Sequence, residues 1–406
     1  MKLMHTADWQ LGARFSQFGE KAALLREARL ETLEKTLQLA RDEEVDAFLI
    51  AGDLFDDNQV DNALVERVLA LFAARPDVPV FILPGNHDPH TGPGCIWERE
   101  GFKNAPEHVH VFRDAEAVEV AGAWLLASPL RQKLSTVDPS LKLDALAAEL
   151  PADAVKIGIT HGSLDIPSLR QDNDFPIDVE AASRGGLNYL AIGHWHGWQT
   201  FDEDKIVMPG TPEPDDFSQE KSGFVALAEI DAQGAARVEQ RRVATLNWAH
   251  HEIDLADEAV VRSRLDEDLK ALDADPEKAV LRVTLTGRTD PGEASRLKGW
   301  LNERAKPFAV FQLRDQTALK LSEAALADLR QRSPLLAQVF ADLDRIEGMI
   351  GGETEVAALP EAASDITLNA LQQLAESARI EISDLAPGHI NEARSLILQN
   401  LQEENQ

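Results

Sequence analysis

The chain has 406 residues, of which 44% are hydrophobic, and its formal net charge is −30. This length exceeds one ordinary domain, so we expect two or three domains with packed cores. The negative charge argues against a protein that holds nucleic acid through a generally basic surface, but it leaves open a local basic groove or a metal-centred grip on phosphate. The single cysteine, Cys95, excludes an internal disulfide framework and a cysteine-built zinc site.

Targeting and membrane signals are missing from the sequence. The first residues carry no basic segment followed by an apolar run, and no stretch of about 18 apolar residues occurs. We therefore expect a soluble, cytoplasmic protein that does not associate with a membrane.

The first part of the chain alternates apolar runs of strand length with helical patterns. The helical patterns cover 20–43 and 61–74. The apolar runs cover 2–8, 46–53, 78–88, 123–130, 155–163, 187–196, 205–211 and 223–230. Such an alternation, followed by a run of strands, predicts a layered α/β domain, which we place at 1–247.

The pattern changes after about residue 248. Two helix–strand units follow and predict a small α+β domain at 248–320. Its helices are expected near 255–273 and 292–305, and its strands at VLRVTLTG (280–287) and FAVFQLR (308–314). Apolar residues at three- and four-residue spacing then predict a helical region at 321–406, with helices at 322–350 and 365–402 and a linker near 351–365.

Five of the predicted strands end in polar clusters beside a glycine. The clusters contain Asp8; Asp53; Asn86, His87 and Asp88; His161; and His194 and His196. The carboxyl ends of parallel strands meet at one edge of a sheet, where open α/β sheets bind their ligands. A single histidine at a strand end is more often structural, but five such clusters are hard to explain by packing alone.

These residue types are typical ligands of divalent metal ions. Carboxylate, imidazole and amide oxygen, without thiolate, suit manganese, iron or zinc. Asp53 offers two oxygens and can bridge two ions about 3.5–4 Å apart. Because only Asp8 and Asp53 subtract from the charge of two divalent ions, the site keeps a charge of about +2 and attracts phosphate.

The order of these motifs resembles the calcineurin-like metallophosphoesterase superfamily. The matching elements are Asp8, GDLFD (52–56), GNHD (85–88), His161 and GHWH (193–196). The segments HTADW, GDLFDDNQV and MPGTPEPDDFSQEKSGFVALAEI are similar to those of the SbcD-type exonucleases of DNA double-strand-break repair. The resemblance implies a two-sheet sandwich flanked by helices over 1–247, a small capping domain and C-terminal helices.

The resemblance also implies the role of each residue. One ion would be held by Asp8, Asp53 and His196, and the other by Asp53, Asn86, His161 and His194. His87 would stabilise the transition state or donate a proton, with Asp88 orienting it. Manganese is the ion that we expect at both positions.

Gln10 departs from the family pattern. The family usually has a histidine here, which completes the shell of the first ion. A neutral amide is a poorer donor than imidazole for most transition ions. We predict that Gln10 is a weak ligand and that the first ion binds more loosely than the second.

Three functions remain open. The first is a DNA exonuclease or endonuclease that works with a separate SbcC-like SMC-type ATPase, because the chain has no phosphate-binding GxxxxGK[ST] loop. In this case the C-terminal helices dock on the ATPase, and a homodimer is a further open partner. The second is a metallophosphoesterase that acts on a small nucleotide or a phosphoprotein, which the acidic charge favours. The third is a non-enzymatic scaffold whose first metal position has decayed at Gln10. The PGTPEPDDF segment and the extra C-terminal domains favour the first.

Overall fold

The computed structural model describes most of the first 319 residues and a few beyond them. The described ranges are 1–166, 174–219, 221–255, 265–267, 269–270, 272–289, 291–319, 337–339 and 341–343. The chain forms two compact units, Met1–Ala249 with Lys278–Val280, and His250–Glu277 with Leu281–Gln406. Nearly all of the predicted helical region 321–406, and most of the helix predicted near 255–273, lie outside the described residues.

The first sheet has six strands in the order β12-β11-β1-β2-β3-β4. Their bounds are β1 Lys2–Thr6, β2 Ala47–Ala51, β3 Val80–Leu83, β4 Val109–Val111, β11 Phe224–Ile230 and β12 Ala236–Arg242. Strands β1 to β4 are parallel, whereas β11 runs antiparallel to both β1 and β12. The sequence of β2, AFLIA, is buried throughout, as expected for a central parallel strand that is covered on both faces.

The second sheet also has six strands, in the order β5-β6-β7-β8-β10-β9. Their bounds are β5 Glu116–Val120, β6 Ala123–Ala127, β7 Lys156–His161, β8 Tyr189–Gly193, β9 Gln199–Phe201 and β10 Ile206–Met208. Strands β6, β7, β8 and β10 are parallel, and the edge strands β5 and β9 run antiparallel to their neighbours. In both sheets, therefore, the parallel strands supply a common carboxyl edge.

Alternate residues of each strand face different cores. In β2, Leu49 points into the core between the two sheets, whereas Phe48 and Ile50 point to the outer core of the first sheet. In β8, Ala191 lies in the shared core and Ile192 in the outer core of the second sheet. The two sheets thus pack face to face, and each buries its outer face under helices.

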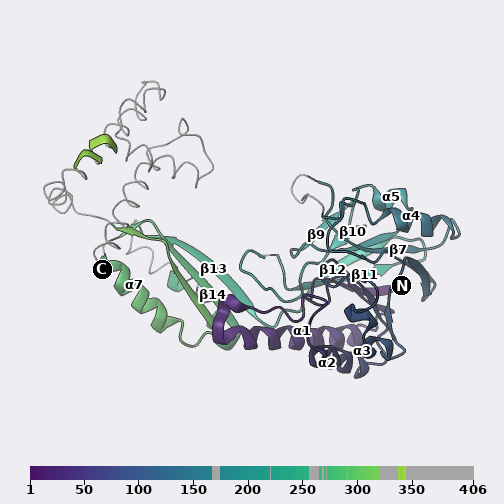
Figure 1. Cartoon of the computed structure of the whole chain (residues 1–406), viewed down its shortest axis with the longest axis horizontal. Helices are drawn as coiled ribbons and strands as arrows, with labels where there is room; N and C mark the ends of the chain where they lie inside the picture. Colours follow the sequence, from purple (N-terminus) through teal and green to yellow (C-terminus); the bar gives the residue numbers. More distant parts are fainter. Residues whose placement is uncertain are drawn as a thin grey trace. The chain divides into compact units, whose positions relative to one another are not determined.

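Helices cover both outer faces (Figure 1). Their bounds are α1 Ala22–Asp42, α2 Asn62–Ala73, α3 Glu100–Lys103, α4 Leu141–Ala148 and α5 Ala181–Arg184. Side chains of α1 and α2, such as Leu33 and Phe72, belong to the outer core of the first sheet, and Leu143 of α4 and Ala182 of α5 belong to that of the second. The expected two-sheet sandwich flanked by helices is confirmed.

The second unit contains a three-stranded sheet in the order β13-β14-β16. Strand β13 spans Asn247–Asp254, β14 spans Ala279–Thr286 and β16 spans Val310–Asp315, and α7 covers Pro291–Arg304. A short parallel pair joins β15 (Arg288–Thr289) to β17 (Ala318–Leu319). Strand β13 was not among the predicted elements. Within the described residues, no helix has the length and hydropathy needed to cross a bilayer.

Candidate metal centre

The five polar clusters follow β1, β2 and β3 of one sheet and β7 and β8 of the other. Asp8, Asp53 and His161 lie closest together, since one ligand atom from each falls within 4.8 Å of the other two. All three side chains are buried. The convergence that the strand ends predicted is therefore present in the fold.

The backbone bends sharply to place the carboxylates. Asp8 has a φ of 54° and Asp53 a φ of 55°, in the left-handed region that non-glycine residues rarely adopt. Gly52 has a φ of 97°, and a Cβ there would lie 2.0 Å from His161 Nδ1. At Gly85, a Cβ would lie 2.2 Å from Asp53 Oδ1. Only glycine lets the loops approach this closely, and the left-handed conformations carry a cost of order 1–3 kcal/mol each.

Two imidazole rings converge on the side-chain oxygen of Asn86. His161 Nε2 lies 2.8 Å from Asn86 Oδ1, and His194 Nδ1 lies 2.9 Å from the same oxygen. His161 Nδ1 lies 2.8 Å from the carbonyl oxygen of Ala51, to which it donates a proton. In neutral His161, Nε2 then presents a lone pair, so Nε2 and Asn86 Oδ1 are two electron-pair donors that a shared cation brings together.

The charges of the buried groups respond to one another. Burial alone would raise the pKa of Asp53, but the neighbouring His161 outweighs burial and holds the pKa of this carboxyl below its usual range. Burial would lower the pKa of His161, but the charge of Asp53 and the contact with it raise the pKa of His161 to about 9. Burial also raises the pKa of Asp8. The buried carboxylates therefore favour a positive charge at this point, which a divalent ion supplies in competition with protons.

Gln10 lies inside the same centre. Its side chain is 2% exposed, and its Nε2 donates to Asp53 Oδ2 over 2.9 Å. Its Oε1 is buried and has no hydrogen-bond partner among the described residues. Because a buried oxygen without a partner is costly, this atom fits a position next to a cation. The residues present thus fit a divalent metal centre, including at the position that departs from the family pattern.

His196 lies at the margin of the centre and is held from outside. Its Nδ1 lies 2.6 Å from Gln219 Nε2 and 3.9 Å from the carboxylate of Asp215. Asp215 also pairs with Arg29 over 3.0 Å. Gln219, Asp215 and Arg29 were missed by the sequence analysis, because they belong to no strand-end cluster and contact the histidine only through the fold.

His87 is exposed beside the buried carboxylates. Its backbone N–H donates to Asp53 Oδ1 over 2.9 Å, and its ring Nδ1 lies 3.0 Å from the carbonyl oxygen of Asp56. The ring is thus anchored through one nitrogen, with the other left for a substrate.

The expected role of Asp88 needs correction. Its Oδ1 accepts from the backbone N–H of Gly85 over 2.8 Å, and its Oδ2 accepts from that of Phe55 over 2.9 Å. The side chain is fully buried, and burial raises the pKa of Asp88 to about 7. Because both oxygens bind the backbone, Asp88 joins two loops of the centre and does not orient the ring of His87.

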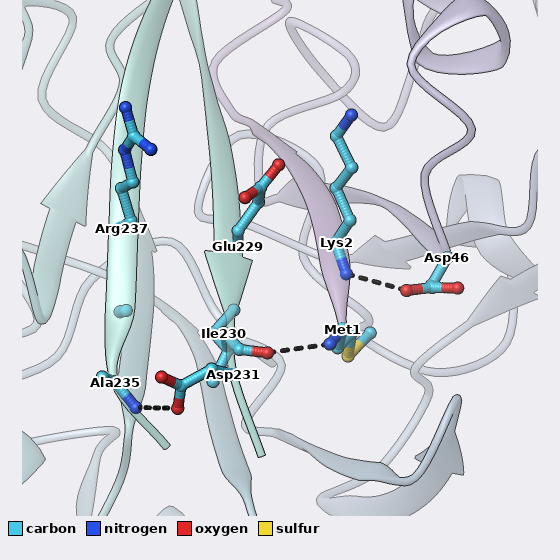
Figure 2. Close-up of a pocket in the computed structure, with 9 residues that line it drawn as sticks. Met1, Lys2, Asp46, Glu229, Ile230, Asp231, Ala235 and Arg237 are labelled. Carbon is cyan, nitrogen blue, oxygen red and sulfur yellow. Dashed lines mark hydrogen bonds between the residues drawn. The ribbon is translucent and has the colours of Figure 1, made fainter. Parts of the chain in front are cut away.

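A second hollow, of about 540 Å³, lies at the opposite end of β1 (Figure 2). There the Met1 amino group donates to the carbonyl oxygen of Ile230 over 2.8 Å, and the backbone N–H of Lys2 donates to Asp46 over 2.7 Å. These polar groups are used to hold the strand ends together. We therefore place the chemistry at the carboxyl edge of the strands.

Comparison with known proteins agrees with this geometry. The calcineurin-like phosphoesterase family model matches residues 1–217, a stretch that contains every residue of the candidate centre. The SbcD component of the nuclease SbcCD of Bacillus subtilis (strain 168) is 27% identical over 274 residues, which are 57% of this chain and 66% of that protein. This chain therefore spans slightly less than two thirds of that relative. Since the family match covers more than half of the chain, the protein belongs to the calcineurin-like phosphoesterase family.

Proposed function

We propose that this protein is a metal-dependent DNA exonuclease or endonuclease that hydrolyses phosphodiester bonds in DNA repair. The observation that carries the proposal is the convergence of Asp8, Asp53 and His161, with Asn86 and His194 beside them. Paired divalent ions at such a centre suit phosphoryl chemistry. The similarity to a component of a nuclease supports DNA as the substrate.

The proposed centre holds two ions, with manganese preferred. The ligands of the first ion are Asp8, Gln10, Asp53 and His196, and those of the second are Asp53, Asn86, His161 and His194. This mixture of carboxylate, imidazole and amide oxygen suits manganese better than a softer ion. When bound, the two ions supply Lewis-acid polarisation of the phosphate and an activated water as nucleophile.

His87 is the proposed general acid. In the hydrolysis, the water oxygen forms a bond to phosphorus while the bond from phosphorus to the leaving sugar oxygen breaks. The carbonyl oxygen of Asp56 accepts from His87 Nδ1, so the protonated ring presents its Nε2–H to the substrate. That proton passes to the leaving oxygen, which departs as a hydroxyl group.

Two other functions are tested by the same experiment. Linear duplex DNA and bis(p-nitrophenyl) phosphate are each incubated with the protein and manganese, with and without excess chelator. Manganese-dependent cutting of DNA together with cleavage of the small diester is expected. Cleavage of the small diester alone would favour a phosphoesterase acting on a small nucleotide or a phosphoprotein, and activity on neither would favour a scaffold.

The proposed partner is an SbcC-like SMC-type ATPase. The Bacillus relative is named as one component of the nuclease SbcCD, and the region 321–406 of this chain has the apolar spacing of docking helices. Deleting residues 351–406 should abolish co-purification with the ATPase and leave hydrolysis of the small diester intact. Co-purification that survives the deletion would refute this docking site. Association into a homodimer is a separate proposal that sedimentation of the full chain would test.

A further inference from the structure

Asp174 contacts a proposed metal ligand, although it lies outside every strand-end cluster. Its Oδ2 lies 2.7 Å from His194 Nε2 and accepts from Ser163 Oγ over 2.8 Å. Asp174 is only 9% exposed and Ser163 only 3%. The carboxylate is thus nearly buried, with one oxygen shared between the ring of His194 and a hydroxyl group.

This contact fixes which nitrogen of His194 carries a proton. A carboxylate only accepts hydrogen bonds when it is ionised, so His194 Nε2 is the protonated nitrogen. In the neutral ring, Nδ1 then presents its lone pair on the side of Asn86, whose Oδ1 is 2.9 Å away. Nδ1 and Oδ1 are both electron-pair donors in this state, which is the arrangement that two ligands of one ion require.

The backbone around Asp174 is held independently of this contact. The N–H of Ser163 donates to the carbonyl oxygen of Asp174 over 3.2 Å, and the N–H of Ile177 donates to that of Ser163 over 2.8 Å. On the other side, the N–H of Phe175 donates to the carbonyl oxygen of Ser135 over 2.9 Å. A change in the Asp174 side chain should therefore leave its backbone in place.

A close backbone approach joins the same segment to the loop after His161. Gly162 has a φ of 154°, and a Cβ at this position would lie 2.3 Å from the carbonyl oxygen of Phe175. Through Ser163 and Asp174, the loop that carries His161 is thus connected to the ring of His194. Both histidines are proposed ligands of the same ion.

We propose that Asp174 is a positioning residue for the second metal ion, which fixes the Nε2–H tautomer of His194 and strengthens its Nδ1 as a ligand. This inference rests on the proposed function. Carboxylate groups that accept from the outer nitrogen of a ligand histidine set its orientation and raise its basicity, and their loss usually lowers metal affinity 10–100-fold. Asp174 thus deepens the site by a residue that touches neither the ion nor the substrate.

The test is manganese binding to Asp174→Asn, measured by calorimetry on the full chain. One of the two binding events should weaken by about 10–100-fold and the other should keep its affinity. Hydrolysis of bis(p-nitrophenyl) phosphate should fall at limiting manganese and return toward the wild-type kcat at excess manganese. Ser163→Ala, which keeps the carboxylate, should weaken the same event by a smaller factor.

Asp178→Asn is the matched control. Asp178 belongs to the same segment, but its carboxylate pairs with Arg184 over 2.8 Å, away from the centre. Both manganese affinities should stay at the wild-type values in this variant. If Asp174→Asn also binds manganese as the wild type does, or if both binding events weaken equally together with a lower Tm, the positioning role is wrong.

The wild-type protein separates this inference from the proposed function. A wild type that binds manganese and cleaves the diester, next to an unaltered Asp174→Asn, overturns the role of Asp174 alone. A wild type that binds no manganese overturns both, because there is then no ion for His194 to hold.

Discussion

Gln10 occupies a position in which an amide can act as a ligand at little cost. Its Nε2 donates to Asp53 Oδ2 and thereby orients the side chain, while its Oε1 is buried without a hydrogen-bond partner among the described residues. The amide is thus held by the bridging carboxylate itself. An oxygen held in this way gains more from a nearby cation than an exposed amide does, because it has no water to lose.

The substitution Gln10→His should strengthen the weaker of two manganese affinities. Imidazole is the better donor for a transition ion, and a gain of about 10-fold is expected for a restored ligand bond. Calorimetry with manganese measures both steps, and the rate of diester cleavage at limiting manganese should rise in parallel. Two equal, tight sites in the wild type, or a histidine variant that binds no better, would show that Gln10 is not a weakened ligand.

His87→Ala should remove catalysis without removing metal. The backbone N–H that donates to Asp53 Oδ1 is retained in alanine, so the carboxylate keeps this contact. Loss of the general acid should lower kcat for the diester by about 10²–10⁴-fold. Manganese content, measured by elemental analysis, should equal that of the wild type. A variant that loses both ions would show that His87 is a ligand.

Arg29 connects helix α1 to two loops of the centre. It is 1% exposed, it donates to the carbonyl oxygen of Trp9, and it pairs with Asp215 over 3.0 Å. Its guanidinium also lies over the ring of Phe15, 5.4 Å from the centroid. One residue in the first turns of α1 therefore holds the loop after β1 close to the segment that contacts His196.

Arg29→Met should destabilise the protein by about 3–5 kcal/mol, because it leaves the buried carbonyl of Trp9 and the carboxylate of Asp215 without this partner. The Tm from thermal unfolding should fall by roughly 10 °C. Arg26→Met, on the exposed face of the same helix, is the control and should change stability by less than about 0.5 kcal/mol. Equal Tm values for the two variants would contradict the role assigned to Arg29.

The sequence predicted the elements that are long and apolar, and the ligands that follow them. The patterns at 20–43 and 61–74 correspond to α1 (Ala22–Asp42) and α2 (Asn62–Ala73), because each buries an apolar stripe of several turns. The short or polar strands β4, β5, β9 and β12 were missed. Strand β12, for example, reads ARVEQRR and is nowhere fully buried, so its pairing with β11 depends on the sheet and not on its own pattern.

The residues behind the ligands could not be predicted from spacing. Asp174 is 20 residues from His194 in sequence, and Asp215 is 19 from His196. No periodicity relates such pairs, since irregular loops bring them together. The role of Asp88 was misjudged for a related reason: adjacency to His87 in sequence suggested contact, but a fully buried carboxylate needs donors, and two backbone N–H groups are closer.

The net charge of −30 places a particular demand on the whole molecule. A chain with 70 acidic and 40 basic residues repels a phosphate backbone at long range. A metal centre with a positive charge reverses this repulsion locally, at the edge where the buried carboxylates lie. Ion binding should therefore serve both the chemistry and the approach of the substrate.

Manganese should also stabilise the folded chain, because the ligands come from loops of both sheets and converge only after folding. At a manganese concentration of 100 times Kd, one binding event adds about 2.7 kcal/mol to the free energy of unfolding. For a unit of this size, that gain raises Tm by roughly 5–10 °C, and excess chelator should reverse it. Asp53→Asn removes the proposed bridging carboxylate and is the control, in which the increase with manganese should vanish whatever the Tm of the metal-free variant. If the Tm of the wild type does not respond to manganese, or if Asp53→Asn responds equally, then the strand-end residues do not form a metal centre that the fold assembles.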